Sequence, residues 1–597
     1  MKLKKILLVT YVMCWLICVL SVASIKDASI SFYLVLMVPL LSSIYFFSND
    51  LKEEHIIYGN KKCILWCSVI SVVFASLFIG QELFLSSERM TISYVRIAFL
   101  ILLSFVLLPS SPFMFIIFDK VGMKISEKGA CSSLKIGFVC AVIMFFIQLL
   151  FSLSFYPCTM TGDSVTHWYQ AVNDEIMSDY NPLIFNMLLK FLFHINGGKS
   201  PYPYVVFLNV LFSFVFGDVI TYLRRLGIKI KYLIIGTIVV AILPPTYMLL
   251  TYLSKNPLIA IINLSLTLNL LKILTLPNLY CKKITWYIGT VISMASLYIL
   301  KENHVVIVFP LAFLLLYFFK KNNFLFRRFL VTIVCSVIII LVIKGPLYNS
   351  LTYVHEEKKH ETIRPLMAPI ASALQLGLDI PDEVLALAEK VLPIDEWVSR
   401  YDSSNSDPLT WGEPRPQYVA ISLGEAFRSY FVMLKEYPDV VLKDRLDGMN
   451  IIWNIDINGE KYNYRCPMGL DERVTFEDLE DYGIFGDSFY TFIGRLRIFL
   501  TELVELTGRI GIVNTLCWRS GIYIVLLLME ILYLKIKRRT SLVWSIAPTV
   551  SILITDMLVI AWQMYFYLWF FPMSVILLLI VGCVYNEDLR GKDVCVN

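Results

Sequence analysis

The chain has 597 residues, of which 57% are hydrophobic and 17% are charged, and its formal net charge is +5. A soluble protein of this length would divide into several domains with charged surfaces, so the composition excludes that class. The apolar residues recur in runs of about 18–25, long enough to cross ~30 Å of hydrocarbon. We therefore expect an all-α polytopic membrane protein, and the small positive charge gives no reason to expect nucleic-acid binding.

The apolar runs divide the chain into four parts. Residues 1–135 are predicted to form a four-span scaffold, and residues 136–346 a membrane core with a polar outer loop at 157–182. Residues 347–517 are predicted to form a mainly helical extracytoplasmic domain, and residues 518–597 three spans and a cytoplasmic tail. About fourteen spans result, since a helix needs roughly 20 apolar residues to cross the bilayer. They are expected near 6–24, 29–48, 64–84, 94–118, 136–156, 203–222, 232–250, 257–276, 284–300, 304–319, 329–346, 519–535, 541–560 and 563–584.

Lys and Arg in the short loops predict the orientation, because cytoplasmic loops carry an excess of both. In the fourteen-span arrangement the basic clusters all fall on one side, which we assign to the cytoplasm together with both termini. The loop 157–182 and the region 347–517 then lie outside the plasma membrane. The basic clusters are at 2–5, 52–62, 120–135, 224–231, 282–283, 320–328 and 535–539.

The outer loop contains the segment TMTGDSVTHWYQAVNDEIMSDYNP at 159–182, which has four carboxylates and no Lys or Arg. Ionisable groups this close to a bilayer are costly, which makes them candidates for function. Asp163 and His167 are four residues apart and would share one helix face. We predict Asp163 as a general base and His167 as its partner in the catalytic site. The alternative is that Asp163 belongs to a helix cap.

Three more carboxylates follow in the same segment, namely Asp174, Glu175 and Asp179. Oxygen ligands of this kind suit a divalent cation such as Mg or Mn, which could bridge to a substrate phosphate. The alternative is a solvated loop, and no cofactor is certain. The amphipathic run at 183–195 is too short to span the membrane and is predicted to lie at its outer surface.

Isolated cations at the outer ends of spans run against the positive-inside bias. Lys255 and Lys301 occupy very short outer connections, and Arg364 follows the last span of the core. We predict that together they bind an anionic headgroup such as phosphate. The alternative is that their long side chains reach to the membrane surface without binding a ligand.

The region 347–517 contains two clear helix signals. The sequence PDEVLALAEKVL at 381–392 begins with Pro and acidic residues, and its apolar residues recur at helical spacing. The sequence SLGEAFRSYFVMLKEYP at 422–438 has the same pattern and ends at a proline. Between them, RYDSSNSDPLTWGEPRPQ is rich in turn-forming residues and is predicted to be an irregular loop.

The stretch TGDSVTHWYQAVND…SDYNPLIFNMLLKFLF resembles the first external loop of GT-C-type membrane glycosyltransferases. The closer likeness is to a group of uncharacterised bacterial multi-span proteins with the same outer loop, and it covers roughly residues 136–584. Asp163 takes the position of the family's catalytic Asp, whereas Asn181 stands where the family has His. Lys301-Glu302-Asn303 matches an Arg-x-Asn-like motif of the group with Lys in place of Arg.

The resemblance implies a glycosyltransferase that takes a sugar from a polyprenyl-phosphate donor. Its other partners would be membrane lipids and a glycan, lipid or protein acceptor outside the membrane. Asp163 would act on the acceptor, and Lys255, Lys301 and Arg364 would bind the donor phosphate. Asp174, Glu175, Asp179, Asn181 and Asn303 complete the predicted substrate-binding set. A flippase or other transporter of lipid-linked oligosaccharides, and a polysaccharide polymerase or ligase, are the alternatives.

Overall fold

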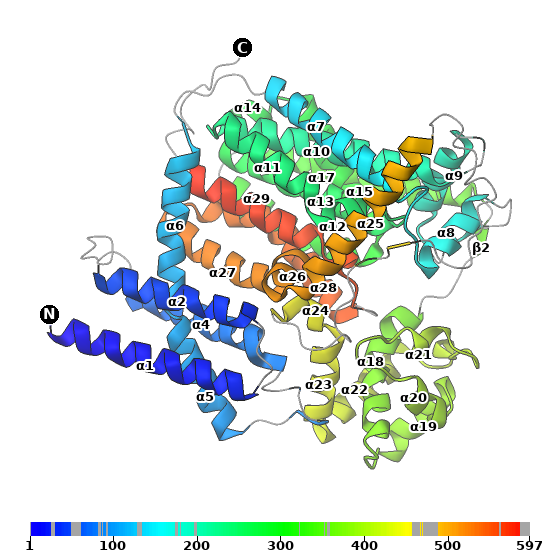
Figure 1. Ribbon diagram of the computed structural model, residues 1–597. Coiled ribbons are helices and arrows are strands. Elements are labelled where there is room, and N and C mark those ends of the chain that lie inside the picture. The colour runs from blue at the N-terminus through cyan, green and yellow to red at the C-terminus, as the bar shows by residue number, and fades with distance from the viewer. Residues whose placement is uncertain are drawn as a thin grey trace.

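The computed structural model describes residues 2–25, 30–48, 61–81, 85, 88–90, 93–127, 134–172, 177–179, 181–195, 197, 200–320, 323–351, 353–354, 359–455, 466, 468–469, 487–559 and 563–585. Almost all regular structure in these residues is helical (Figure 1). The first group of helices comprises α1 (Lys2–Ile25), α2 (Ile30–Ser48), α4 (Lys61–Gly80), α5 (Tyr94–Leu107) and α6 (Ser110–Ile125).

The membrane core follows and contains the segment that carries Asp163. Its elements are α7 (Leu134–Ser154), α8 (Gly162–Val172), β1 (Met177–Ser178), α9 (Leu183–Ile195), α10 (Tyr202–Arg225), α11 (Ile230–Ile242), α12 (Pro244–Leu250), α13 (Lys255–Thr275), α14 (Pro277–Tyr280), α15 (Ile284–Leu300), η2 (Glu302–Ile307), α16 (Val308–Phe313), η3 (Leu314–Phe319), α17 (Asn323–Val342), η4 (Ile343–Leu347) and β2 (Tyr353–Val354). The two short strands pair in parallel, which ties the chain after α8 to the chain that leads out of the core.

The remaining elements form a helical unit and the last apolar helices. They are α18 (Lys359–Gln375), α19 (Asp382–Val391), α20 (Ile394–Arg400), α21 (Pro408–Trp411), η5 (Tyr418–Ala420), α22 (Leu423–Glu436), α23 (Pro438–Gly448), α24 (Asn450–Trp453), α25 (Asp487–Arg509), α26 (Gly511–Trp518), α27 (Gly521–Ile536), η7 (Thr540–Ser545), α28 (Ala547–Val559), η8 (Tyr565–Tyr567) and α29 (Phe570–Val584). The helices predicted at 381–392 and 422–438 are confirmed as α19 and α22.

Six helices of the described residues are long and apolar enough to cross a membrane. They are Lys62–Gly80, Tyr94–Ile125, Leu134–Ser154, Tyr202–Arg225, Lys255–Thr275 and Asn323–Leu347. Two bent pairs raise the number to eight if each is one span: α11 with α12, bent by 61°, and α26 with α27, bent by 69°. The predicted all-helical architecture with apolar spans is confirmed, whereas the count of about fourteen spans stays a prediction.

Some of the predicted spans are interrupted or change helix type along their length. The run at 232–250 is broken before Pro244, since a proline has no N–H to continue the helical hydrogen bonds. The run at 304–319 is one continuous helix whose geometry changes from η2 through α16 to η3, and the run at 541–560 divides into η7 and α28. Hydropathy measures apolar length and is insensitive to such breaks.

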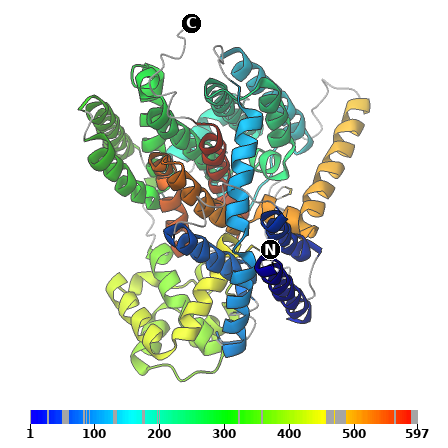
Figure 2. The same cartoon turned by 90° about the vertical axis from the view of Figure 1, so that its left-hand side faces the viewer.

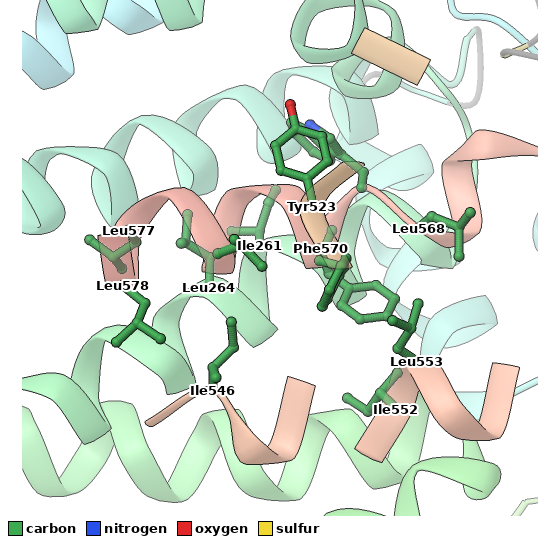
Figure 3. Close-up of a cluster of buried hydrophobic side chains, with 14 of the residues drawn as sticks. Ile261, Leu264, Tyr523, Ile546, Ile552, Leu553, Leu568, Phe570, Leu577 and Leu578 are labelled. Atoms are coloured by element: carbon green, nitrogen blue, oxygen red, sulfur yellow. The ribbon is translucent and has the colours of Figure 1, made fainter. Parts of the chain in front are cut away.

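The buried apolar side chains form two clusters. The larger one includes side chains from α13, α27, α28 and α29, some of which are drawn in Figure 3. The smaller one lies within 363–441, with Trp397 and Met367 fully buried at its centre. Figure 2 shows this unit, in yellow-green, as a separate lobe beside the apolar helices.

The smaller cluster covers only part of the range 347–517 that the sequence analysis groups into one domain. Buried side chains of α24, α25 and α26 belong to the larger cluster instead. Among the described residues, hydrogen bonds of α23 join the smaller unit to segments that lie between the apolar helices, and Gln563 also contacts α24. Arg89 donates two hydrogen bonds to Asp439, of 2.6 and 2.9 Å. The amide of Gln563 donates to the carbonyl of Asp447 at 2.7 Å and accepts from the N–H of Ile451 at 2.9 Å.

Basic loops that are distant in sequence meet at one end of the apolar helices. The ammonium of Lys229 donates to the carbonyl of Lys124 at 2.7 Å, and Arg224 pairs with Glu127. Lys537 pairs with Asp119 at 2.8 Å. In Figure 1 this end is at the upper left, near α14 and the upper end of α6, whereas α8 and α9 lie at the right.

Candidate functional site

A cavity of about 920 Å³ lies where the smaller helical unit meets the membrane core and the segment that includes η8. A cavity of this size suits a ligand with several rings, since small-molecule sites span roughly 300–1,000 Å³. Its lining combines carboxylates, cations and aromatic rings. The lining residues are Thr161, Gly162, Asp163, Thr166, Gln170, Asn181, Lys359, His360, Asp407, Thr410, Trp411, Arg415, Pro416, Gln417, Tyr418, Val419, Met564, Phe566 and Tyr567.

Asp163 is the second residue of α8, and its exposed side chain lines the cavity. The start of α8 is fixed by its neighbours. Thr161 shares a 2.8 Å hydrogen bond with the hydroxyl of Tyr252, and the N–H of Thr161 donates to Ser164 Oγ at 3.1 Å. The preceding loop pairs with the chain before α13, because the N–H of Leu253 donates to the carbonyl of Thr159 at 3.0 Å. The carboxylate lies in the first turn of α8.

His167 does not line the cavity, although it lies one turn after Asp163. Its ring is buried between α8 and α9, where Nδ1 is 2.7 Å from Asn186 Oδ1 and the ring packs edge-on against Phe185. The amide of Asn186 donates in turn to Gln170 Oε1 at 2.5 Å. Hydrogen bonds connect His167 to the cavity through Asn186 and Gln170, and Gln170 is the member of that chain that lines it.

Burial lowers the pKa of His167 to about 3, and the positive charge of Lys255 adds to the effect, while the hydrogen bond with Asn186 opposes it. The folded chain thus holds this imidazole neutral, whereas the unfolded chain binds a proton below pH ~6.5. Protonation of His167 therefore has no effect on the free energy of unfolding above pH ~6.5. As the pH falls from there toward 3, the free energy of unfolding decreases by at most about 1.4 kcal/mol per pH unit.

We expect the melting temperature of the purified protein to fall between pH 7 and pH 4.5 more steeply than that of a His167→Gln variant. Glutamine keeps a polar partner for Asn186 and cannot take up a proton in this range. Differential scanning fluorimetry of both proteins over this pH series measures the difference. Parallel pH curves for the two proteins would contradict the buried neutral imidazole.

The three cations predicted to bind phosphate lie behind the cavity wall, each beside a lining residue. The ammonium of Lys255 donates to Asn181 Oδ1 at 3.1 Å. Lys301 pairs with Asp556 at 2.5 Å and lies 5.7 Å from the ring centre of Tyr567. The buried guanidinium of Arg364 donates to Thr410 Oγ1 at 2.9 Å and is 3.7 Å from Asp407. The structure thus places each of these cations beside a residue that lines the same cavity as Asp163, whereas the cations themselves are not part of the lining.

Of the other predicted residues, some line the cavity and others do not. Asn181 lines the cavity, whereas Asp179 and Asn303 do not. Asp174 and Glu175 lie outside the described residues, so the predicted cation-binding loop is not placed. Within the described part of the chain, no group of three or more His, Cys, Asp or Glu side chains is arranged to hold a metal ion.

The cavity has a second carboxylate, Asp407, which was not predicted from the sequence. Burial raises its pKa, the charge of Arg364 opposes the rise, and the negative charge of Asp163 adds to it. The two carboxyl groups are therefore close enough to influence each other. Asp407 follows a turn in which its N–H donates to Asn405 Oδ1 at 3.0 Å. Such side-chain turns are typical of Asn and Asp. The Asn and Asp residues of this turn-rich stretch were therefore the sequence signal that could have indicated a fixed position for Asp407.

A cationic and aromatic group on the same unit was likewise not predicted from the sequence. It comprises Lys359, His360, Trp411 and Arg415, all of which line the cavity. The guanidinium of Arg415 lies 5.4 Å from the ring centre of Trp411, and the ring of His360 lies 5.7 Å from it. Trp411 is 47% exposed.

The fold and the site together describe a helical protein with apolar spans and a polar cavity at the junction with a separately packed helical unit. In comparisons with known proteins, no family model, no curated protein and no solved structure matches this chain.

Proposed function

We propose that the protein is an integral membrane glycosyltransferase that moves a sugar from a polyprenyl-phosphate donor to an acceptor outside the cytoplasmic membrane. The observation that carries this proposal is the place of Asp163. Its exposed carboxylate lines a cavity of about 920 Å³ between the membrane core and a separate helical unit. A general base needs this access to its substrate, and the cavity has room for a sugar together with an acceptor group.

The proposed reaction uses the ionised Asp163 as a general base. The carboxylate accepts the proton of an acceptor hydroxyl, whose oxygen forms a new bond to the anomeric carbon of the donor sugar. The bond from that carbon to the phosphate oxygen breaks, and the bonding electrons leave with the lipid phosphate. Met564 and Phe566 give part of the cavity an apolar lining, which suits the first isoprene units of the lipid.

The proposal includes the fourteen-span topology, with the basic loops in the cytoplasm and Asp163 outside. It is supported by the meeting of Lys124, Arg224 and Lys229 at one end of the apolar helices. The segments predicted to be outside, with Asp163 and Asp407, meet in the cavity. The helices shorter than a full span, such as α28 and α29, would complete the crossings together with their 3₁₀ neighbours.

We expect an Asp163→Cys variant to react with a membrane-impermeant maleimide added to intact cells, since position 163 is exposed and faces outside in this topology. The wild-type chain, whose Cys158, Cys466 and Cys517 are buried, serves as the background. Labelling measured by gel shift should exceed that background without permeabilising the cells. Labelling that requires permeabilised membranes would contradict the orientation and with it the proposed reaction.

The function itself is tested by comparing lipid-linked and cell-surface glycans of cells with and without this chain. If the protein is a transferase, cells without it should make an outer glycan that lacks one sugar. The unused lipid-linked sugar should accumulate in these cells. Accumulation of a donor accessible only from the cytoplasm would indicate a flippase instead. Shortened polymers of an otherwise complete repeating unit would indicate a polymerase or ligase.

A further inference from the structure

The cationic and aromatic group on the smaller helical unit, which we call the cationic wall (Lys359, His360, Trp411 and Arg415), has a composition suited to a ligand. We propose that it binds the anionic group of a phosphorylated sugar. The proposal rests on the proposed function, because it takes the cavity as the place where the sugar is transferred.

Charge on the smaller unit favours an anion at this place. Lys359 and Arg415 both line the cavity, and Lys359 is the first residue of the 17-residue helix α18, whose positive end therefore adjoins it. The carboxylate that this unit contributes, Asp407, is 3.7 Å from the buried guanidinium of Arg364. Arg364 therefore offsets the charge of Asp407, and the unit adds the cationic side chains of Lys359 and Arg415 to the cavity lining. Guanidinium and ammonium groups form charge-assisted hydrogen bonds with phosphate oxygens.

Trp411 gives the wall a surface for the sugar ring. Its indole is 47% exposed although it lies in a cavity, and the ring of His360 and the guanidinium of Arg415 lie within 6 Å of its centre. A large aromatic ring exposed beside cations is suited to a ligand that has both an apolar face and a charge. The C–H face of a pyranose next to its phosphate has these two properties.

Arg400 holds in place the segment 411–415, which begins at the last residue of α21 and includes Trp411 and Arg415. The guanidinium of Arg400 donates to Glu396 at 2.7 Å and to the carbonyl of Pro414 at 3.0 Å. A Cβ at Gly412 would lie 2.4 Å from Arg400 Nη1, so the glycine permits the guanidinium to pass directly beneath the loop. The backbone of this part of the wall is therefore positioned before any ligand arrives, which reduces the entropy lost on binding.

The phosphate could come from the lipid-linked donor or from an anionic acceptor saccharide. The test uses the full-length protein in lipid nanodiscs and measures binding of polyprenyl monophosphate, of a water-soluble sugar phosphate and of the matching uncharged sugar. The variants are Lys359→Gln, Arg415→Gln and their double. The matched controls are Arg428→Gln and Lys435→Gln, which remove exposed cations of α22 outside the cavity lining.

We expect each variant of the wall to weaken binding of a phosphorylated probe about tenfold, the usual effect of losing one charge-assisted hydrogen bond. Binding of the uncharged sugar and the behaviour of the controls should not change. If the variants lose binding of polyprenyl phosphate alone, the wall binds the donor. If they lose binding of the soluble sugar phosphate alone, the wall binds the acceptor. A Trp411→Leu variant should lose more affinity for the soluble sugar phosphate than for inorganic phosphate.

Wild-type affinity of the double variant for both phosphorylated probes would overturn the inference, as would equal weakening in the Arg428→Gln control. A wild-type chain that binds neither probe would overturn it as well. An Asp163→Asn variant separates the inference from the function. If that variant transfers sugar normally, the catalytic assignment fails while the binding results stand on their own.

Discussion

An Asp163→Asn variant is expected to lose sugar transfer by at least about a hundredfold, since a general base contributes roughly 10²–10⁴ to the rate. Asparagine has nearly the same shape but cannot accept the proton of the acceptor hydroxyl. The side chain is exposed at the start of α8, so the variant should fold and insert as the wild type does. The measurement compares outer glycans and accumulated lipid-linked sugar in cells that produce each variant.

A Glu389→Gln variant is the matched control, because it removes an exposed carboxylate of α19 that does not line the cavity. Its glycans should equal those of the wild type. Normal transfer by Asp163→Asn at wild-type protein levels would show that Asp163 is not the base. Asp407 would then be the next carboxylate to test, since it lines the same cavity.

A Lys301→Met variant is expected to destabilise the protein by about 3–5 kcal/mol, because it leaves the buried carboxylate of Asp556 without its cation. The Asp556 side chain is only 3% exposed and lies 2.5 Å from the ammonium. A double variant with Asp556→Leu should recover most of the loss, since it removes the buried charge as well. Thermal unfolding of the three detergent-purified proteins measures both effects.

A Lys344→Met variant is the control for that experiment. Lys344 pairs with Glu302, whose side chain is 61% exposed, and exposed pairs contribute only about 0–1 kcal/mol. A stable Lys301→Met protein that has lost only its affinity for lipid phosphate would contradict the structural role. It would favour the sequence-based expectation that Lys301 binds the donor directly.

Local signals in the sequence were sufficient to predict individual helices. In α22, Ser422 accepts from the N–H of Glu425 and the Glu425 side chain accepts in return, a capping box formed within four residues. The short amphipathic run after Pro182 is confirmed as the helix α9. Such elements are encoded by neighbouring residues and need no knowledge of the tertiary fold.

The cavity could not be predicted in the same way, because its walls meet across long separations in sequence. Asp163 and Asp407 come together only once α8 and the smaller helical unit are placed. His167 shares a helix with Asp163 but faces α9, because Asn186 provides its hydrogen-bond partner there. Helical spacing shows which residues share a helix face and leaves open which neighbour covers that face.

The separate apolar cluster of residues 363–441 has a consequence for how this protein can diversify. Because that unit has its own core, substitutions in its loops do not require the membrane helices to repack. One half of the cavity can therefore change its ligand preference while the half that carries Asp163 stays constant. Under the proposed function, changes in this unit would alter selectivity and leave the proposed base in place, as binding loops do on other stable scaffolds.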